Sequence, residues 1–310
     1  EREASDSADR RAMLCPSATA YRISLHSTIG ASPHDNPGGH LGCGPDRSTR
    51  RTLPVVSFDV SADAYDRFMG RYSVPLAEVF ADFAHITAGS RVLDVGCGPG
   101  ALTSELLRRV GDAHVAAVDP SATFVEALRV RHPNIELHRA GAEHMPIADD
   151  AFHAALAQLV VHFMDDPVDG VREMGRVTEP GGIVAACVWD FDEGGSPLSL
   201  FWDAARDLDA RARGEAALPG TRRGHLAALL REAGLDDVDD AMLSVTVEHG
   251  SFDEWWSPFE LGVGPAGEYI SGLGSSARRR LMERCRELLP AAPFSVTAAA
   301  WAARGTVRRR

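Results

Sequence analysis

The sequence predicts an α/β fold built on a doubly wound, mostly parallel sheet, and two features carry that prediction. The first is a short apolar run, Arg91 to Val95, that ends in a glycine cluster and continues at helical spacing from Ala101 to Val110. The second is the order of the later segments, because strand-like and helix-like runs alternate as far as residue 190. Such alternation is typical of parallel sheets with helices on both faces.

The glycine cluster consists of Gly96, Gly98 and Gly100 in the spacing G-x-G-x-G. Glycine has no Cβ, so the backbone can turn sharply here and a ligand can approach it closely. A dinucleotide fingerprint would read G-x-G-x-x-G and would hold the helix N-terminus back for a pyrophosphate. The early third glycine and Pro99 favour an uncharged or cationic group instead.

Two acidic residues lie beside this turn. Asp119 follows the second predicted strand, residues 113–118, at about the distance where an acid binds ribose hydroxyls. Asp94 lies inside the first predicted strand, where a carboxylate is costly to bury unless it accepts hydrogen bonds. A cofactor contact is one interpretation of Asp94, and a cap on local backbone amides is the other.

From Val92 to Gly100 the chain reads VLDVGCGPG, which resembles the first motif of the class I S-adenosylmethionine (SAM)-dependent methyltransferases of bacterial small-molecule type. The similarity continues through Val118–Pro120, Ala142–Pro146 and Arg172–Gly182, in the family's order. The resemblance implies a Rossmann-like, seven-stranded sheet with an antiparallel last strand and helical lid insertions. It also implies SAM as cofactor, an unidentified small-molecule acceptor and no metal.

The resemblance and the predicted strand ends together assign the site. The residues expected to bind the cofactor are Asp94, Gly96, Cys97, Gly98, Gly100, Asp119, Ala142, Glu143, Gln158, Tyr65 and Arg71. Gly141 stands where the family often has an Asp for the adenine amino group, so we expect backbone groups near Ala142 and apolar contacts to hold adenine.

Gln158 and His162 follow the fourth predicted strand and should lie near the methyl donor. His162 is the candidate general base, because the unperturbed pKa of histidine is near neutrality. The alternative is a histidine that only packs the strand-to-helix turn.

Tyr65 and Arg71 lie on a helical segment before the first strand, which we expect to split near Gly70 and Ser73. They face the SAM carboxylate or the substrate if this segment covers the cofactor. The alternative is that it only supplies an apolar covering face.

Beyond residue 190 the resemblance is looser. We expect residues 64–72, 198–213 and 252–259 to form a lid, with Trp255 or Trp256 lining an apolar acceptor pocket. The alternative places both tryptophans in the core. Further helices are expected at 225–233 and 275–289, and strands at 242–248 and 294–303.

Length and composition limit the number of domains, the kinds of partner and the cellular location that we expect. The chain has 310 residues and a net charge of -12, which disfavours nucleic-acid and anionic membrane partners. We expect a disordered tail at residues 1–57, rich in Ser, Pro, Gly and Arg, and one methyltransferase domain at 58–310 with its SAM-binding core at about 88–190. Scattered cysteines, no apolar run of about 18 residues and no signal peptide favour a cytoplasmic protein, and the Lys-free, Arg-rich composition favours a bacterial source.

Two other functions stay open. An NAD(P)-dependent oxidoreductase shares the strand, glycine turn and helix and the acid at the second strand, although the glycine spacing speaks against it. A SAM-binding protein without turnover would carry the same cofactor motifs.

Overall fold

The computed structural model describes residues 60–309, so the expected tail at residues 1–57 lies outside the described residues. Seven strands form one sheet in the order β3-β2-β1-β4-β5-β7-β6. β7 runs antiparallel to both of its neighbours, and the other paired strands are parallel. The predicted doubly wound sheet with an antiparallel last strand is confirmed. The strands are β1 Val92–Val95, β2 Val115–Val118, β3 Glu136–His138, β4 Phe152–Gln158, β5 Thr178–Trp189, β6 Asp236–His249 and β7 Phe294–Thr306.

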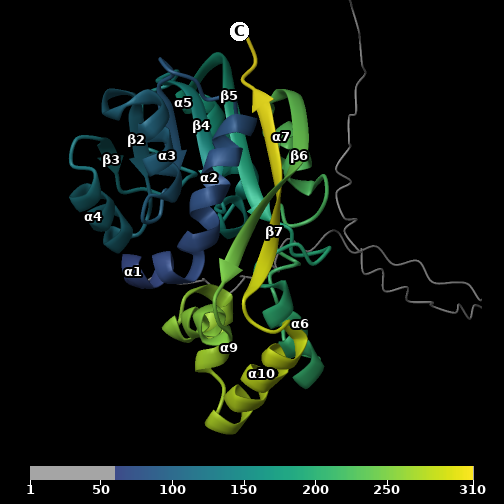
Figure 1. Ribbon diagram of the computed structural model, residues 1–310. Helices are drawn as coiled ribbons and strands as arrows, with labels where there is room; N and C mark the ends of the chain where they lie inside the picture. The colour runs from purple at the N-terminus through teal and green to yellow at the C-terminus, as the bar shows by residue number, and fades with distance from the viewer. Residues whose placement is uncertain (1–59, 310) are drawn as a thin grey trace, which may run out of the picture. The chain divides into compact units, whose positions relative to one another are not determined.

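Helices cover both faces of the sheet (Figure 1). Val92 packs in the same core cluster as residues of α2 and α3, whereas Leu93 packs with α5 and α7, because successive side chains of a strand point to opposite faces. The helices are α1 Ala62–Tyr65, α2 Arg71–Phe83, α3 Ala101–Val110, α4 Ala122–Arg131, α5 Pro167–Val177, α6 Ser199–Leu208, α7 His225–Glu232, α8 Phe252–Trp256, α9 Gly264–Ser271 and α10 Ser275–Leu288.

The segment before β1 differs from the prediction. A π-helical turn, η1 Asp66–Gly70, joins α1 directly to α2, so the expected split near Gly70 and Ser73 is wrong. The chain stays helical because this stretch is buried: Phe68 and Met69 in η1 and Leu76 in α2 all belong to the main core cluster. Single π-helical turns are frequent at functional sites.

The helices α6, α9 and α10 gather beyond one end of the sheet (Figure 1), where α6 packs on α10. α8 continues as a 3-10 turn, η4 Ser257–Leu261, that packs on α9. We call α8, η4 and α9 the cap. The sequence pattern did not predict α9 because glycines dominate this stretch, although Pro265 is well placed in the first turn of the helix. None of the described helices has both the length and the apolar character needed to cross a bilayer.

Candidate functional site

The turn after β1 leaves room for a ligand at one glycine and none at its neighbours. Gly96, Gly98 and Gly100 all have positive φ, at 70, 52 and 102°. A Cβ on Gly96 would lie 2.5 Å from the methyl groups of Val160, and one on Gly100 would lie 2.4 Å from Leu128 Cδ1. A Cβ on Gly98 would meet nothing within 4 Å. Gly96 and Gly100 therefore serve packing, whereas Gly98 exposes its backbone to open space.

Asp119 lies beside this open space, at the end of β2. Its Oδ2 accepts a hydrogen bond from the Gly98 amide at 2.9 Å, and its Oδ1 accepts one from the Ser121 amide at 2.8 Å. Burial raises the pKa of the carboxyl group, and the two amide bonds oppose that rise. Each carboxylate oxygen has two acceptor sites, so Asp119 can still accept from two hydroxyl donors.

Asp94 is buried beneath the turn. Its Oδ2 accepts a hydrogen bond from Thr103 Oγ1 of α3 at 2.6 Å. Burial raises the pKa of Asp94 to about 7, the Thr103 hydroxyl opposes the rise and the charge of Asp119 adds to it. The backbone of Thr103 also favours the ionised form, so the capping alternative describes this side chain at least as well as a cofactor contact does.

Three other predicted cofactor residues have protein partners. Gln158 Nε2 donates to the Ser73 carbonyl at 2.9 Å and ties β4 to α2. Glu143 Oε1 accepts from the Asp165 amide at 2.9 Å, just before α5. The Arg71 guanidinium contacts His249 Nδ1 at 2.9 Å and Glu254 Oε1 at 2.8 Å. Arg71 thus ties α2 to β6 and the cap, and its contact with the SAM carboxylate stays a prediction.

Cys97 and Ala142 are both buried. Cys97 packs with Ala117 and Leu128, and burial raises the pKa of its thiol well above the usual value, which makes the thiol unreactive. Ala142 belongs to the core cluster on the α5 side of the sheet. At Gly141 a Cβ would lie 3.1 Å from Glu143 Oε2, so Glu143 fills part of the space that an Asp side chain would need.

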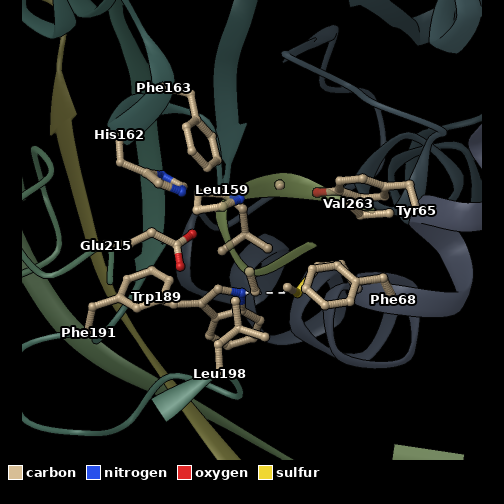
Figure 2. Close-up of a pocket in the computed structure, with 14 residues that line it drawn as sticks. Tyr65, Phe68, Leu159, His162, Phe163, Trp189, Phe191, Leu198, Glu215 and Val263 are labelled. Carbon is tan, nitrogen blue, oxygen red and sulfur yellow. Dashed lines mark hydrogen bonds between the residues drawn. The ribbon is translucent and has the colours of Figure 1, made fainter. Parts of the chain in front are cut away.

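A mostly apolar cavity, whose wall Figure 2 shows, is linked to the turn. The link is direct in the chain, because Val160, which packs on Gly96, follows Leu159 in the cavity wall. Leu159 has a φ of 62°, a strained value that clusters at functional sites when the residue is not glycine. The wall consists of Tyr65, Phe68, Met69, Leu159, His162, Phe163, Trp189, Phe191, Leu198, Glu215 and residues 263–266.

The free volume of this cavity is small. It is about 30 Å³, close to the share of one molecule in liquid water. Most ligand pockets are several hundred Å³. An acceptor of ordinary size therefore needs the walls, among them η1 and the start of α9, to move apart.

His162 lies in the cavity wall, in a 3-10 turn after β4, Val161–Phe163, and its place near the methyl donor stays a prediction. Its ring lies 3.8 Å from that of Phe163, centroid to centroid, and its buried Nδ1 has no hydrogen-bond partner among the described residues. Burial lowers the pKa of His162 to about 3, so the imidazole is neutral at neutral pH. The packing alternative describes this residue, and its role as a general base stays a prediction.

Glu215 was not predicted from the sequence. It lies in the connection after α6, its side chain is buried, and Oε2 accepts a hydrogen bond from Trp202 Nε1 at 3.0 Å. Burial raises the pKa of Glu215 to about 7, and the Trp202 bond opposes the rise. No motif marks this acid, because only the tertiary fold brings it to the cavity.

A methyltransferase-domain family model matches residues 93–186, from β1 into β5. Residues 93–186 are therefore assigned to a methyltransferase domain. It is 36% identical over 142 residues to an uncharacterized methyltransferase of Mycobacterium tuberculosis, covering 46% of this chain and 55% of that protein. It is 38% identical over 92 residues to a demethylmenaquinone methyltransferase of Chlorobaculum parvum, covering 30% and 38%. The chain therefore spans about half or less of these curated relatives.

A solved structure from Anabaena variabilis shares the fold. That protein is described as a methyltransferase from an antibiotic biosynthesis pathway. The two structures match with a TM-score of 0.53 at 15% sequence identity, over 74% of this chain and 96% of that one. At this identity the likeness extends to the fold alone.

SAM is the cofactor of this methyltransferase domain, and the residues at the turn fit it. Asp119 keeps acceptor sites for ribose hydroxyls, and the space over Gly98 lets a ligand reach the backbone. Two carboxyl groups, Asp94 and Asp119, suit a cationic ligand better than a pyrophosphate. Among the described residues no group of three or more potential metal ligands lies together.

The tryptophans of the cap, Trp255 and Trp256, are absent from the described wall of the cavity. Trp255 and Trp256 are each 3% exposed and pack with Phe201 and Phe259 in one aromatic cluster. The prediction that one of them lines the acceptor pocket is wrong for this cavity, and the core alternative holds. The cap instead contributes residues 263–266, at the start of α9.

Proposed function

We propose that the protein transfers the methyl group of SAM to a small-molecule acceptor that binds in the cavity. One observation carries the proposal: Tyr65 of the cavity wall lies close enough to Asp119 for the charge of that carboxylate to act on it, and Leu159 of the same wall precedes Val160, which packs on Gly96. A cofactor bound over Gly98 and an acceptor bound in the cavity would then share one boundary.

Bound SAM supplies a methyl group that its sulfonium already activates, so the chain has only to bind, orient and exclude water. Tyr65 and Phe68 from the N-terminal helices and Trp189 from the end of β5 close the cavity with aromatic rings. His162 presents a neutral imidazole, which can accept a hydrogen bond from an acceptor nucleophile. In this proposal Gly98 and Asp119 bind the cofactor, and Tyr65 lies between cofactor and acceptor. Burial and the charge of Asp119 both raise the pKa of Tyr65.

The relatives support a small molecule as acceptor without identifying it. The Chlorobaculum relative is named for demethylmenaquinone, but the match covers 38% of that protein. The cavity wall of this chain includes residues outside the matched domain, at positions 65 to 69 and 189 to 266. We therefore derive the acceptor class from the cavity itself.

Calorimetric titration tests the cofactor half of the proposal. The full chain should bind SAM and its demethylated product S-adenosylhomocysteine, and should not bind NAD. Tighter binding of NAD than of either sulfur compound would support the oxidoreductase alternative and overturn the proposal.

The narrow cavity favours a second candidate, a SAM-binding protein without turnover, because about 30 Å³ holds no acceptor in this conformation. Methyl-labelled SAM separates the two. Incubation with a small-molecule extract should move label from SAM to an organic product. Tight SAM binding with no label transfer to any extract component would support the second candidate.

A further inference from the structure

Glu215 brings an acid into a cavity whose described wall contains no arginine, in a chain that has no lysine. The other titratable groups of the wall are Tyr65 and His162. Figure 2 shows the Glu215 carboxyl group directed into the cavity from the same side as the His162 ring. Trp202 Nε1 donates a hydrogen bond to Glu215 Oε2, and no described residue donates one to Oε1. One carboxyl oxygen is therefore left for a ligand.

Among the residues that the structure describes, no cation pairs with Glu215. Burying a carboxylate without a counter-charge is costly, so a ligand that supplies the counter-charge gains from this site. Tyr65, Phe68 and Trp189 add aromatic rings to the same wall, and the faces of such rings attract cations. A carboxylate and several aromatic rings together are suited to an ammonium group.

We propose that Glu215 is an amine-binding residue, and that the acceptor is a small hydrophobic amine whose ammonium group pairs with its carboxylate. The ammonium group anchors the molecule, and a different atom of the acceptor receives the methyl group, because a protonated nitrogen has no lone pair. The inference rests on the proposed function, because it takes the cavity to be the acceptor site. The hydrophobic part of the amine contacts the aromatic wall, and Trp202 holds the carboxylate in place. An acceptor that carries a carboxylate is excluded, because it would put a second negative charge beside a buried one.

The ionisable side chains of the cavity wall make the pairing of amine and Glu215 depend on pH. The pKa of Glu215 is raised to about 7 by burial, that of His162 is lowered to about 3, and that of Tyr65 is raised above its usual value. Around pH 8 Glu215 is therefore the one charged side chain of the described wall. Amine binding should weaken as the pH falls through the Glu215 pKa, because the carboxyl group gains a proton and loses its charge.

Three probes of similar shape test the proposal: 2-phenylethylamine, 2-phenylethanol and 3-phenylpropionate. Each is titrated calorimetrically into the full chain with S-adenosylhomocysteine present, near pH 8. The amine should bind about ten- to a hundredfold more tightly than the alcohol, the range expected for a charge-assisted contact. The carboxylate should not bind.

The variant Glu215→Gln removes the charge and keeps an oxygen that can accept from Trp202. It should lose at least about tenfold in amine affinity and leave alcohol affinity unchanged. Glu193→Gln is the matched control, because Glu193 is exposed and pairs with Arg223 at 3.5 Å outside the cavity. That variant should bind all three probes as the parent protein does.

Equal affinity of the parent protein for amine and alcohol would overturn the proposal, and so would an unchanged amine preference in Glu215→Gln. Absence of amine binding at millimolar concentration would overturn it too. If Glu215→Gln does not fold, the probe comparison and the pH series on the parent protein decide. Affinity for S-adenosylhomocysteine is measured in every sample, and its loss would count against the proposed function rather than against the amine site.

Discussion

The three glycines of the turn should respond differently to the same substitution. Ala at Gly98 meets open space, so its cost to stability is the positive φ alone, about 1–2 kcal/mol for an L-residue in the left-handed region. Ala at Gly96 or Gly100 adds a clash at 2.5 or 2.4 Å, and overpacking of this kind costs about 1–3 kcal/mol more. In a domain of this size, each kcal/mol lowers the melting temperature by about 2–4 °C.

Gly98→Ala should therefore fold, with a melting temperature lower by about 2–8 °C, and should bind SAM at least about tenfold more weakly because its Cβ enters the ligand space. Gly224→Ala is the matched control, since Gly224 also has a positive φ of 70° and open space around its Cβ position. It should show a similar loss of stability and normal SAM affinity. The two quantities are measured by scanning calorimetry and isothermal titration.

The result that would refute this reasoning is a folded Gly98→Ala protein with unchanged SAM affinity. The free space over Gly98 would then not be the cofactor site. A Gly96→Ala protein as stable as Gly224→Ala would refute the packing part, because the contact with Val160 would then have no cost.

Three further predictions concern the acids and the cap. Asp119→Ala should weaken SAM binding about tenfold or more in calorimetric titration, since one lost charge-assisted contact is worth roughly 1.5–3 kcal/mol. The control Asp112→Ala, at an exposed position, should leave SAM affinity unchanged. Equal SAM affinities of the two variants would remove Asp119 from the site. Asp94→Asn should be more stable than the parent near pH 8 by up to roughly 3–4 kcal/mol in denaturant unfolding, because the raised pKa of about 7 favours folding below pH 4 and that contribution is lost as pH rises through 7. Equal stability of the parent protein and Asp94→Asn at both pH 4 and pH 8 would contradict this prediction. Trp255→Leu should lower the melting temperature and leave SAM affinity intact, and an unchanged melting temperature would show that the ring is not part of the core.

The fold and the cofactor turn were predictable because local sequence encodes them. Residues 91–95 show an apolar run that a glycine cluster ends, and α3 begins and ends where helical spacing predicted, at Ala101 and Val110. Asp119 was placed by its distance along the chain from the glycines. Such signals are read within about thirty residues, the length of one strand-helix-strand unit.

The acceptor cavity was not predictable in the same way. Glu215 lies far along the chain from His162, and the two meet in one wall only because the connection after α6 brings Glu215 to the wall that contains Leu159 and Trp189. Trp255 and Trp256 had a plausible pattern for a lid, but a helical aromatic pattern does not tell core from pocket. Arg71 was expected at the cofactor because of its position before β1, and its partners His249 and Glu254 come from elements that sequence spacing could not bring to it.

A crystal structure of the full chain with S-adenosylhomocysteine tests the central claim most directly. The account predicts ribose hydroxyls within hydrogen-bonding distance of the Asp119 carboxylate, the ligand in van der Waals contact with the Gly98 backbone, and the sulfur atom facing the cavity between Tyr65 and His162. A ligand bound elsewhere, or one whose sulfur points away from that cavity, would contradict the account.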